Sequence, residues 1–404
     1  MSSSAAPRYY RSQAEMPPEL VVQVEKSAFE LGETYDSYLV TQSDREYLVS
    51  ADGESLIGFT RIGKDVLVTG GLLAKSENQE RFLTEVLAYV KSRGWRITFF
   101  NASRVACRLF RQHGFQITKC GEEPIVRLDQ TDWRGKDYEW LRRQENFCQR
   151  QGVTLREVNP QSAEYKERIA PELEIISNEH IKNTLHQREM GFFVGLFDAH
   201  ALKRQRLFIA EAAGRVECFV VLNPCLAGSM WAIEIYRQRE GAVRGVVPAA
   251  MLMIMRQLKQ EGVRYVSLSL VPFLRCEMVL KNDSFVARSA VVFSWRHLNF
   301  IFDVRGIYHF KSRFRPYYRE MYFAASPRVG VRTLLAIALS WKLFHFNPFR
   351  LLAQLWRNRG SKARDSLAEP EIRPTKVIRD LIRDDVNHSA ADANDEKQAE
   401  AGQP

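Results

Sequence analysis

Cysteine is scarce in this chain, and its placement argues against a disulfide framework or a metal site. No two thiols form a CxxC pair and no histidine cluster has zinc-ligand spacing; the six cysteines are Cys107, Cys120, Cys148, Cys218, Cys225 and Cys276. Scattered thiols of this kind are typical of buried apolar side chains in a reducing compartment. The N-terminus also lacks the apolar core of a signal peptide. We therefore expect a cytoplasmic protein that needs no metal.

Several catalytic signatures and any long apolar run are also missing. The sequence contains no P-loop, GxGxxG, HExxH or GxSxG motif, which argues against the corresponding nucleotide-binding proteins, zinc proteases and serine hydrolases. No stretch reaches the roughly 20 apolar residues that a membrane-spanning helix needs. The sequence has only partial matches to the acetyl-CoA loop motif of N-acyltransferases, Q/R-x-x-G-x-G/A.

Acidic residues are under-represented in most of the chain. The net charge is +10 over 404 residues, from 58 Lys and Arg against 48 Asp and Glu. Residues 361–404 hold 7 Lys and Arg against 10 Asp and Glu, so residues 1–360 hold 51 against 38. A basic body of this kind favours an anionic partner, either nucleic acid or an anionic membrane.

The most informative stretch is 299–323, where aromatic residues alternate with cations. It reads NFIFDVRGIYHFKSRFRPYYREMYF and has only Asp303 and Glu320 as acidic residues. Such a pattern is typical of a surface that neutralises phosphate and stacks against a polyanion. A solvated helix with an aromatic core face is the alternative.

A second basic and apolar stretch follows, over 331–359. It reads VRTLLAIALSWKLFHFNPFRLLAQLWRNR, its charges are all basic, and Asn347 and Pro348 divide it into two expected short helices. Large apolar residues combined only with cations predict an interfacial segment lying on anionic lipid. A helical hairpin docked on the protein's own core remains the alternative.

The order of expected elements is that of two α/β units in tandem. In the first, a helix from residue 20 leads into short strands over 38–43, 46–52, 55–63 and 65–71; a helix over 77–93, a strand over 96–103, a short helix and two closing strands follow. The second pass repeats this order, with a helix over 162–190, three strands, a helix over 247–260 and a strand over 264–272. An internal duplication explains the repetition, and chance similarity of two α/β halves is the alternative.

These observations give six expected regions. They are a disordered N-terminus (1–18), a first domain (19–130), a linker helix region (131–160), a second domain (161–326), basic amphipathic membrane-surface helices (327–360) and a disordered acidic tail (361–404).

Several motifs together resemble a known family. They are RGWRITFFNAS with ACRLFRQHGF, GEEPIVRLD, WRGKDYEWLRRQENFCQRQGVTLREV, WAIEIYR, YVSLSLVPF and GIYHFKSRFRPYYREMYFA. The chain resembles the C-terminal synthase region of the phosphatidylglycerol lysyltransferases, or multiple peptide resistance factors, without their flippase part. The resemblance implies two tandem GNAT-like acyltransferase domains, of which the second (161–326) is expected to be catalytic. It also implies transfer of an amino acid from aminoacyl-tRNA to a lipid head group, with no cofactor besides that co-substrate, at the inner face of the cell membrane.

The resemblance also implies which residues act. Glu234 stands where the family usually has Asp, and it is expected to anchor the donor's ammonium group or act as a base. Arg237 would hold a phosphate or the ester. Cations expected to bind tRNA or a lipid phosphate are Lys311, Arg313, Arg305, Lys136 and Arg142. The alternatives are an exposed Glu234–Arg237 ion pair at a strand edge, an acyl-CoA-dependent N-acyltransferase, and a non-catalytic protein that binds lipid or RNA.

Overall fold

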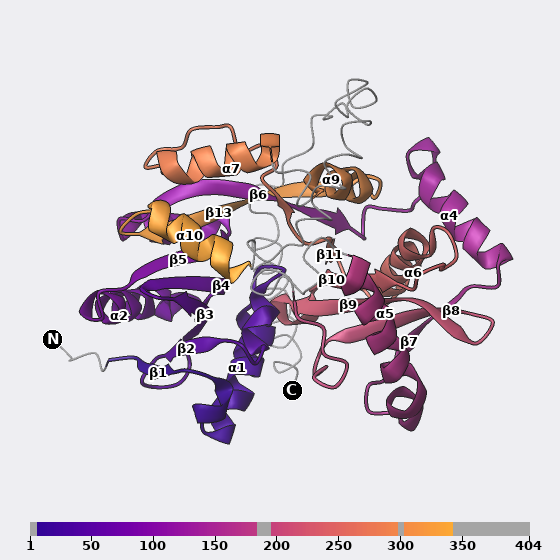
Figure 1. The fold of residues 1–404 in the computed structure, drawn as a ribbon, viewed down its shortest axis with the longest axis horizontal. Coiled ribbons are helices and arrows are strands. Elements are labelled where there is room, and N and C mark those ends of the chain that lie inside the picture. The colour runs from indigo at the N-terminus through magenta and orange to yellow at the C-terminus, as the bar shows by residue number, and fades with distance from the viewer. Residues whose placement is uncertain (1–5, 184–194, 298–302, 342–404) are drawn as a thin grey trace, which may run out of the picture.

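The computed structural model describes residues 6–183, 195–297 and 303–341, and one mixed β-sheet runs through them (Figure 1). Within these residues the sheet has 13 strands in the order β1-β2-β3-β4-β5-β13-β6-β11-β10-β9-β8-β7, and β12 pairs with β6 beside this path. Helices cover both faces of the sheet. The predicted α/β fold class is confirmed.

The first half of the chain supplies one end of the sheet. Its helices are α1 (Pro18–Leu31), α2 (Gln79–Ser92) and α3 (Arg104–Gln112). Its strands are β1 (Arg8–Tyr10), β2 (Glu46–Val49), β3 (Leu56–Ile62), β4 (Asp65–Leu73), β5 (Arg96–Ala102) and β6 (Gln116–Arg127).

The second half supplies the other end. Its helices are α4 (Glu139–Arg150), α5 (Ala170–Asn183), α6 (Val246–Gln260), α7 (Phe285–His297), α9 (Val304–Ser312) and α10 (Val331–Ser340). Its strands are β7 (Thr154–Val158), β8 (Arg206–Ala212), β9 (Arg215–Cys225), β10 (Met230–Gln238), β11 (Tyr265–Ser267), β12 (Val271–Pro272) and β13 (Tyr317–Ser326).

The two halves repeat one connection. Antiparallel β3 and β4 are followed by α2 and by β5, which runs parallel to β4. Antiparallel β9 and β10 are followed by α6 and by β11, which runs parallel to β10. A parallel pair needs such a crossover because the chain must return to the same end of the sheet before the next strand begins. This repeated order agrees with the predicted duplication, and the tandem GNAT-like assignment stays a prediction.

The halves also exchange strands. β13, from the end of the described chain, lies between β5 and β6 and is antiparallel to both. β6 pairs in turn with β11, through Ile125–Arg127 and Tyr265–Ser267. Residues expected to belong to the second domain therefore complete the sheet of the first half.

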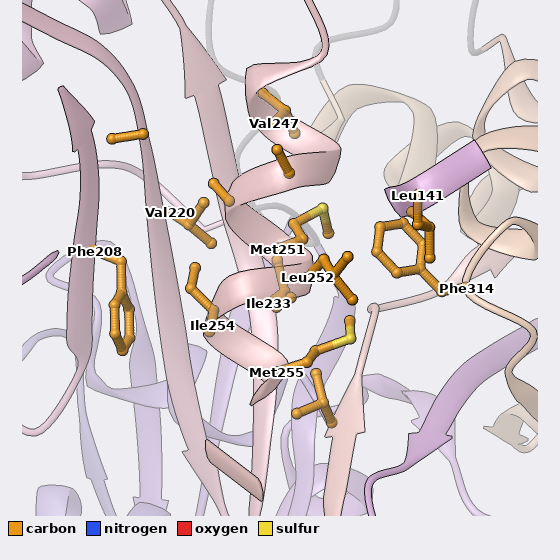
Figure 2. Packing of buried hydrophobic residues seen from close by; sticks show 14 of the residues in the cluster. Leu141, Phe208, Val220, Ile233, Val247, Met251, Leu252, Ile254, Met255 and Phe314 are labelled. Atoms are coloured by element: carbon orange, nitrogen blue, oxygen red, sulfur yellow. The ribbon is translucent and has the colours of Figure 1, made fainter. Parts of the chain in front are cut away.

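Each half of the sheet has an apolar core on both faces. On the first half, α2 and α3 cover one face, and α7, α9 and α10 pack on the other. The long apolar helix α6 packs on the second half, where Figure 2 shows Met251, Leu252 and Met255 beside Leu141 of α4 and Phe314. The strands contribute Phe208, Val220 and Ile233 to the same cluster. α5 packs on the opposite face of these strands.

Some predictions about local structure are wrong. Residues 8–18 are ordered, because β1 pairs with β2 and α1 begins at Pro18. The stretch expected as a strand over 38–43 forms a 3₁₀ helix, Ser37–Thr41. The two closing strands expected in the first domain are one twelve-residue strand, β6.

Other predictions agree in part or lie outside the described residues. The linker helix forms as α4, and the aromatic and basic stretch 299–323 becomes α9 and β13 from Asp303 onward. Of the segment 327–360, only 327–341 is described, and the tail 361–404 lies outside the described residues. No helix in the described ranges combines the length and apolar character needed to cross a bilayer.

A candidate active site where β10 and β11 diverge

A cavity opens where two parallel strands part. β10 and β11 pair only over Met230–Ala232 and Tyr265–Ser267, and β10 then continues to Gln238. The space between the diverging strands is a cavity of about 370 Å³. Its lining comes from both halves of the chain and is mostly apolar: Tyr35, Cys120, His180, Ile233, Glu234, Ile235, Tyr236, Arg237, Ser269, Leu270, Pro272, Phe273, Ile307, Lys311, Phe323 and Trp341.

A β-bulge directs Glu234 toward this cavity. The pairing of β10 with β9 shifts register between Ile233 and Ile235, so Glu234 is an extra residue in its strand. Ile233 packs in the core beneath α6, whereas Ile235 packs in the core beneath α5. In a regular strand these two side chains would lie on the same face. The bulge therefore separates them and leaves Glu234 at the cavity wall.

The carboxylate of Glu234 lies in a poorly solvated position. It accepts hydrogen bonds from the backbone N–H of Gly195 and from the hydroxyl of Ser269, both at 3.2 Å. Burial raises the pKa of Glu234 to about 8, although these two hydrogen bonds and the charge of Lys311 act in the opposite direction. A carboxyl group with this pKa can take up or release a proton near neutral pH.

A side chain at residue 195 would crowd the neighbours of this contact. A Cβ atom at residue 195 would lie 3.4 Å from Glu234 Cγ, 3.2 Å from Leu39 Cδ2 and 3.3 Å from Gln42 Nε2. Gly195 therefore lets the backbone approach both the bulge and the first half of the chain.

Lys311 reaches the same cavity from the last turn of α9. Its ammonium group donates hydrogen bonds to the backbone carbonyl oxygens of Ser269 at 3.2 Å and Leu270 at 3.0 Å. The side chain is 5% exposed. Burial lowers the pKa of Lys311 to about 8, and the charges of Glu234 and Glu123 offset part of that shift. Lys311 and Glu234 therefore titrate in the same pH range on one cavity wall.

Arg237 is held rigidly on the same strand as Glu234. Its guanidinium group hydrogen-bonds the hydroxyl of Ser177 on α5 and lies 5.7 Å from the centre of the Phe197 ring. Arg237 is 6% exposed, so the hypothesis of an exposed Glu234–Arg237 ion pair at a strand edge is wrong. A buried cation beside an apolar cavity suits an anionic group of a ligand.

The other four predicted cations lie elsewhere in the described structure. Arg313 lies 5.4 Å from the ring centre of Trp140, and its Nη2 atom is 2.9 Å from His309 Nε2. Arg305 lies over Trp295 at 6.0 Å, and Arg142 donates to the carbonyl oxygen of Trp133 at 2.7 Å. Lys136 is exposed in the turn Lys136–Tyr138. The structure thus brings Glu234, Arg237 and Lys311 together, and does not add these four to the cavity wall.

The cavity also contains residues that the sequence did not single out. Tyr35 comes from the first half, Ser269 from the segment after β11, and Trp341 from the end of α10. Ser269 has a positive φ of 60°, a strained backbone conformation for a serine. His180 of α5 also lines the cavity.

The matching gap in the first half is filled. β4 and β5 pair in parallel over Asp65–Val68 and Arg96–Phe99 and then diverge. The buried carboxylate of Asp36 occupies this position and accepts hydrogen bonds from Gly70 N at 3.1 Å, Asn101 Nδ2 at 2.9 Å and Thr34 Oγ1 at 2.7 Å. The second half is therefore the better candidate for chemistry.

Comparison with known proteins identifies relatives of the whole two-half unit. The sequence model described as "Phosphatidylglycerol lysyltransferase, C-terminal" matches residues 27–325. A phosphatidylglycerol lysyltransferase of Bacillus subtilis is 24% identical over 289 residues, which is 71% of this chain and 33% of the relative. One from Staphylococcus epidermidis is 19% identical over 286 residues, 70% of this chain and 33% of the relative. The chain thus spans about a third of the length of these relatives.

Solved structures share the fold. L-PGS from Bacillus licheniformis superposes with a TM-score of 0.68 at 21% identity, covering 81% of this chain and 96% of that one. The C-terminal domain of a putative lysylphosphatidylglycerol synthetase from Agrobacterium fabrum gives a TM-score of 0.66 at 20% identity, covering 79% and 95%.

Proposed function

The chain belongs to the phosphatidylglycerol lysyltransferase C-terminal family, and on that premise we propose that it is an aminoacyltransferase. It moves an amino acid from aminoacyl-tRNA to the head group of a membrane lipid such as phosphatidylglycerol. The family resemblance of the sequence motifs is confirmed by the match over residues 27–325. The donor, the acceptor and the residue roles below are proposals.

The observation that carries the proposal is that Glu234 and Lys311 both line one mostly apolar cavity. Both groups have a pKa of about 8. An aminoacyl ester is already activated, so the enzyme needs only to position it, remove a proton from the acceptor and stabilise the negative charge that develops. No covalent nucleophile is required.

The proposed step is a transesterification. The ionised carboxylate of Glu234 takes the proton of the lipid hydroxyl, and the hydroxyl oxygen forms a bond to the aminoacyl carbonyl carbon. The bond from that carbon to the ribose oxygen of the tRNA then breaks. The ammonium group of Lys311 delivers a proton to the departing ribose oxygen, and transfer of the first proton from Glu234 to Lys311 restores both groups.

Arg237 and the apolar lining provide binding. Arg237 forms an ion pair with a phosphate, either of the lipid or of the terminal nucleotide. Ser177 and Phe197 position its guanidinium group for this contact. The apolar walls exclude water, which strengthens these charge interactions and limits hydrolysis of the ester.

The loop that precedes α6 argues against an acyl-CoA donor. A pyrophosphate would bind backbone N–H groups at such a helix N-terminus. In this loop the N–H of Glu240 donates to Glu179 Oε2 at 3.0 Å, and the N–H of Val243 donates to Glu217 Oε2 at 2.8 Å. Pro248, the third residue of α6, has no N–H to donate. An incoming pyrophosphate would have to displace two carboxylates of like charge.

Location follows from the acceptor. A lipid head group is available only at a membrane surface, so the protein acts as a peripheral protein on the inner face of the cell membrane, where charged tRNA is also present. The excess of cations in residues 1–360 supports contact with both anionic partners.

Reconstitution with defined components tests the proposal. The full chain is incubated with vesicles of phosphatidylglycerol and with tRNA carrying a radiolabelled amino acid, and labelled lipid is measured after extraction. We expect labelled lipid that disappears when the tRNA is treated with ribonuclease beforehand. A panel of charged tRNAs identifies the amino acid.

The matched variants are Glu234→Gln and Glu277→Gln. The first removes the proposed base and should lower the rate by about a hundredfold or more, whereas Glu277 is exposed and is not among the residues that line the cavity. Transfer to lipid at the wild-type rate by Glu234→Gln, or turnover only with acyl-CoA, would refute the proposal.

A further inference from the structure

α7 and α10 carry an unusual concentration of exposed apolar side chains. Both lie on the same side of the sheet and contact each other (Figure 1), and Leu334 of α10 packs against the apolar cluster that contains Ala287 of α7. Of the ten large apolar residues exposed in the described ranges, seven belong to α7, α10 or the loop before α7: Met278, Val279, Phe285, Phe293, Val331, Leu335 and Leu339. The most exposed are Phe285 at 73% and Val331 at 76%. A monomeric protein in water rarely exposes so many large apolar side chains on neighbouring segments.

The charges between these side chains are nearly all positive. Four exposed cations lie on these segments or just before α10: Lys281, Arg296, Arg328 and Arg332. The acidic residues there are Glu277 and Asp283, and Asp283 is paired with Arg288 at 3.0 Å. We name these seven apolar residues and four cations the docking face.

One end of α10 lies beside the active-site cavity. Leu335 and Leu339 of α10 are exposed, whereas Ile337 packs in the core beneath the same helix. Trp341, which directly follows α10, lines the cavity. A molecule held against α10 therefore lies next to the wall on which Glu234 and Lys311 are found.

We propose that the docking face binds the surface of an anionic lipid bilayer. Apolar side chains that enter the acyl boundary, surrounded by cations that contact head groups, are the combination such a surface binds. This inference rests on the proposed function, because it brings the acceptor lipid to the cavity.

Charge favours a bilayer over two other occupants. The charged residues of the chain's own segment 342–359 are all cations: Lys342, Arg350, Arg357 and Arg359. Folding this segment onto the docking face would therefore place like charges together. A second copy of the chain would bring two positive faces into contact. An anionic bilayer neutralises the cations and covers the apolar residues at the same time.

Cysteine labelling of the full-length chain tests the inference. All six native thiols are buried, so one exposed engineered thiol reports its own surroundings. The test variant is Leu335→Cys, with Val331→Cys as a second position, and the control is Val22→Cys on α1, which is 67% exposed in the native protein. A water-soluble maleimide is added without vesicles, with vesicles of equal parts phosphatidylglycerol and phosphatidylcholine, and with phosphatidylcholine alone.

We expect Leu335→Cys and Val331→Cys to react quickly without vesicles and about tenfold or more slowly with the anionic vesicles. Pure phosphatidylcholine should have little effect, and Val22→Cys should react at one rate throughout. Equal protection of all three positions, or none, would refute the docking face. Slow labelling without vesicles would also refute it. A rate that does not depend on protein concentration would show that the chain's own C-terminal segment covers the face, and a labelling rate that falls as the protein concentration rises would show that a second copy covers it.

A binding assay separates this inference from the proposed function. Flotation with the same vesicles, without tRNA, should show on the order of tenfold weaker binding for the combined variant Phe285→Ser, Phe293→Ser, Val331→Ser and Leu335→Ser. The control Val22→Ser with Ile175→Ser should bind as wild type does. If the protein binds the vesicles but transfers no amino acid, the docking face is supported and the proposed function is refuted. If the protein does not bind vesicles but transfers the amino acid to detergent-dispersed lipid, the proposed function is supported and the docking face is refuted.

Discussion

The hydroxyl of Ser269 lies 3.2 Å from the Oε2 atom of Glu234 and 2.8 Å from the carbonyl oxygen of Ile233. The segment after β11 therefore contacts the bulge in β10 at the point where the two strands separate. Its backbone also binds Lys311 through the carbonyl oxygens of Ser269 and Leu270. One short segment positions both titrating groups.

Replacing Ser269 with Ala should raise the pKa of Glu234 further. The Ser269 hydrogen bond favours the ionised carboxylate, so its loss favours the protonated form. If Glu234 is the base, the acidic limb of the pH–rate profile should move to higher pH by about half a unit to one unit. Ser229→Ala, which removes an exposed hydroxyl that is not part of the cavity lining, is the control, and an unmoved profile in Ser269→Ala would contradict the assignment.

Glu234 should make the protein less stable as pH rises toward 8. Its pKa in the folded state, about 8, lies above the ordinary value of 4.5. Between these values the folded state holds a proton that the unfolded state has released, so the free energy of unfolding falls with rising pH. Glu234→Gln lacks this dependence, and its stability relative to wild type should increase by roughly 2 to 4 kcal/mol from pH 5 to pH 8. Urea denaturation of both proteins at several pH values measures the difference, and parallel curves would count against a poorly solvated carboxyl group with a raised pKa.

Arg237 and Arg313 should differ sharply in importance, although both match the family motifs. Arg237 lines the cavity, whereas Arg313 lies against Trp140. Arg237→Gln should lower kcat/KM by about a hundredfold, and Arg313→Gln by less than about fivefold under the same conditions. The transfer assay compares the two directly. Similar losses in both variants would mean that the site extends beyond the cavity wall.

Asp36 should be important for stability. Asp36→Ala leaves the buried donors Gly70 N and Asn101 Nδ2 without their acceptor, which should lower the free energy of unfolding by about 3 to 5 kcal/mol. Asp36→Asn keeps one acceptor oxygen and should lose less. Thermal or urea unfolding measures both, and a stable Asp36→Ala protein would show that the gap between β4 and β5 can close by other means.

The sequence predicts the parts of the site that depend on local pattern. Glu234 stands near the end of an apolar strand, which already indicates a poorly solvated carboxylate, and Lys311 lies in the distinctive aromatic and basic stretch. Lys311 and Arg313 cannot be separated by pattern alone. They lie two residues apart, where successive helical positions turn by about 100°, so only one faces the cavity.

Other features depend on contacts between distant parts of the chain. Tyr35 reaches the cavity wall of the second half, some 200 positions away in sequence, and no local signal predicts such a contact. The 3₁₀ helix Ser37–Thr41 resembled a strand because Tyr38, Leu39 and Val40 are consecutive apolar residues. All three are buried by packing that the local sequence does not contain. The bulge at Glu234 leaves the apolar pattern of β10 unchanged, so only the paired strand shows it.

The position of β13 constrains how the protein can be made. During synthesis β5 and β6 leave the ribosome nearly 200 residues before the strand that joins them, so their facing edges stay unpaired until Tyr317–Ser326 emerges. A nascent chain stalled near residue 130 therefore exposes two strand edges that other chains can pair with, and a gene cut between the halves yields fragments that must exchange a strand to become native.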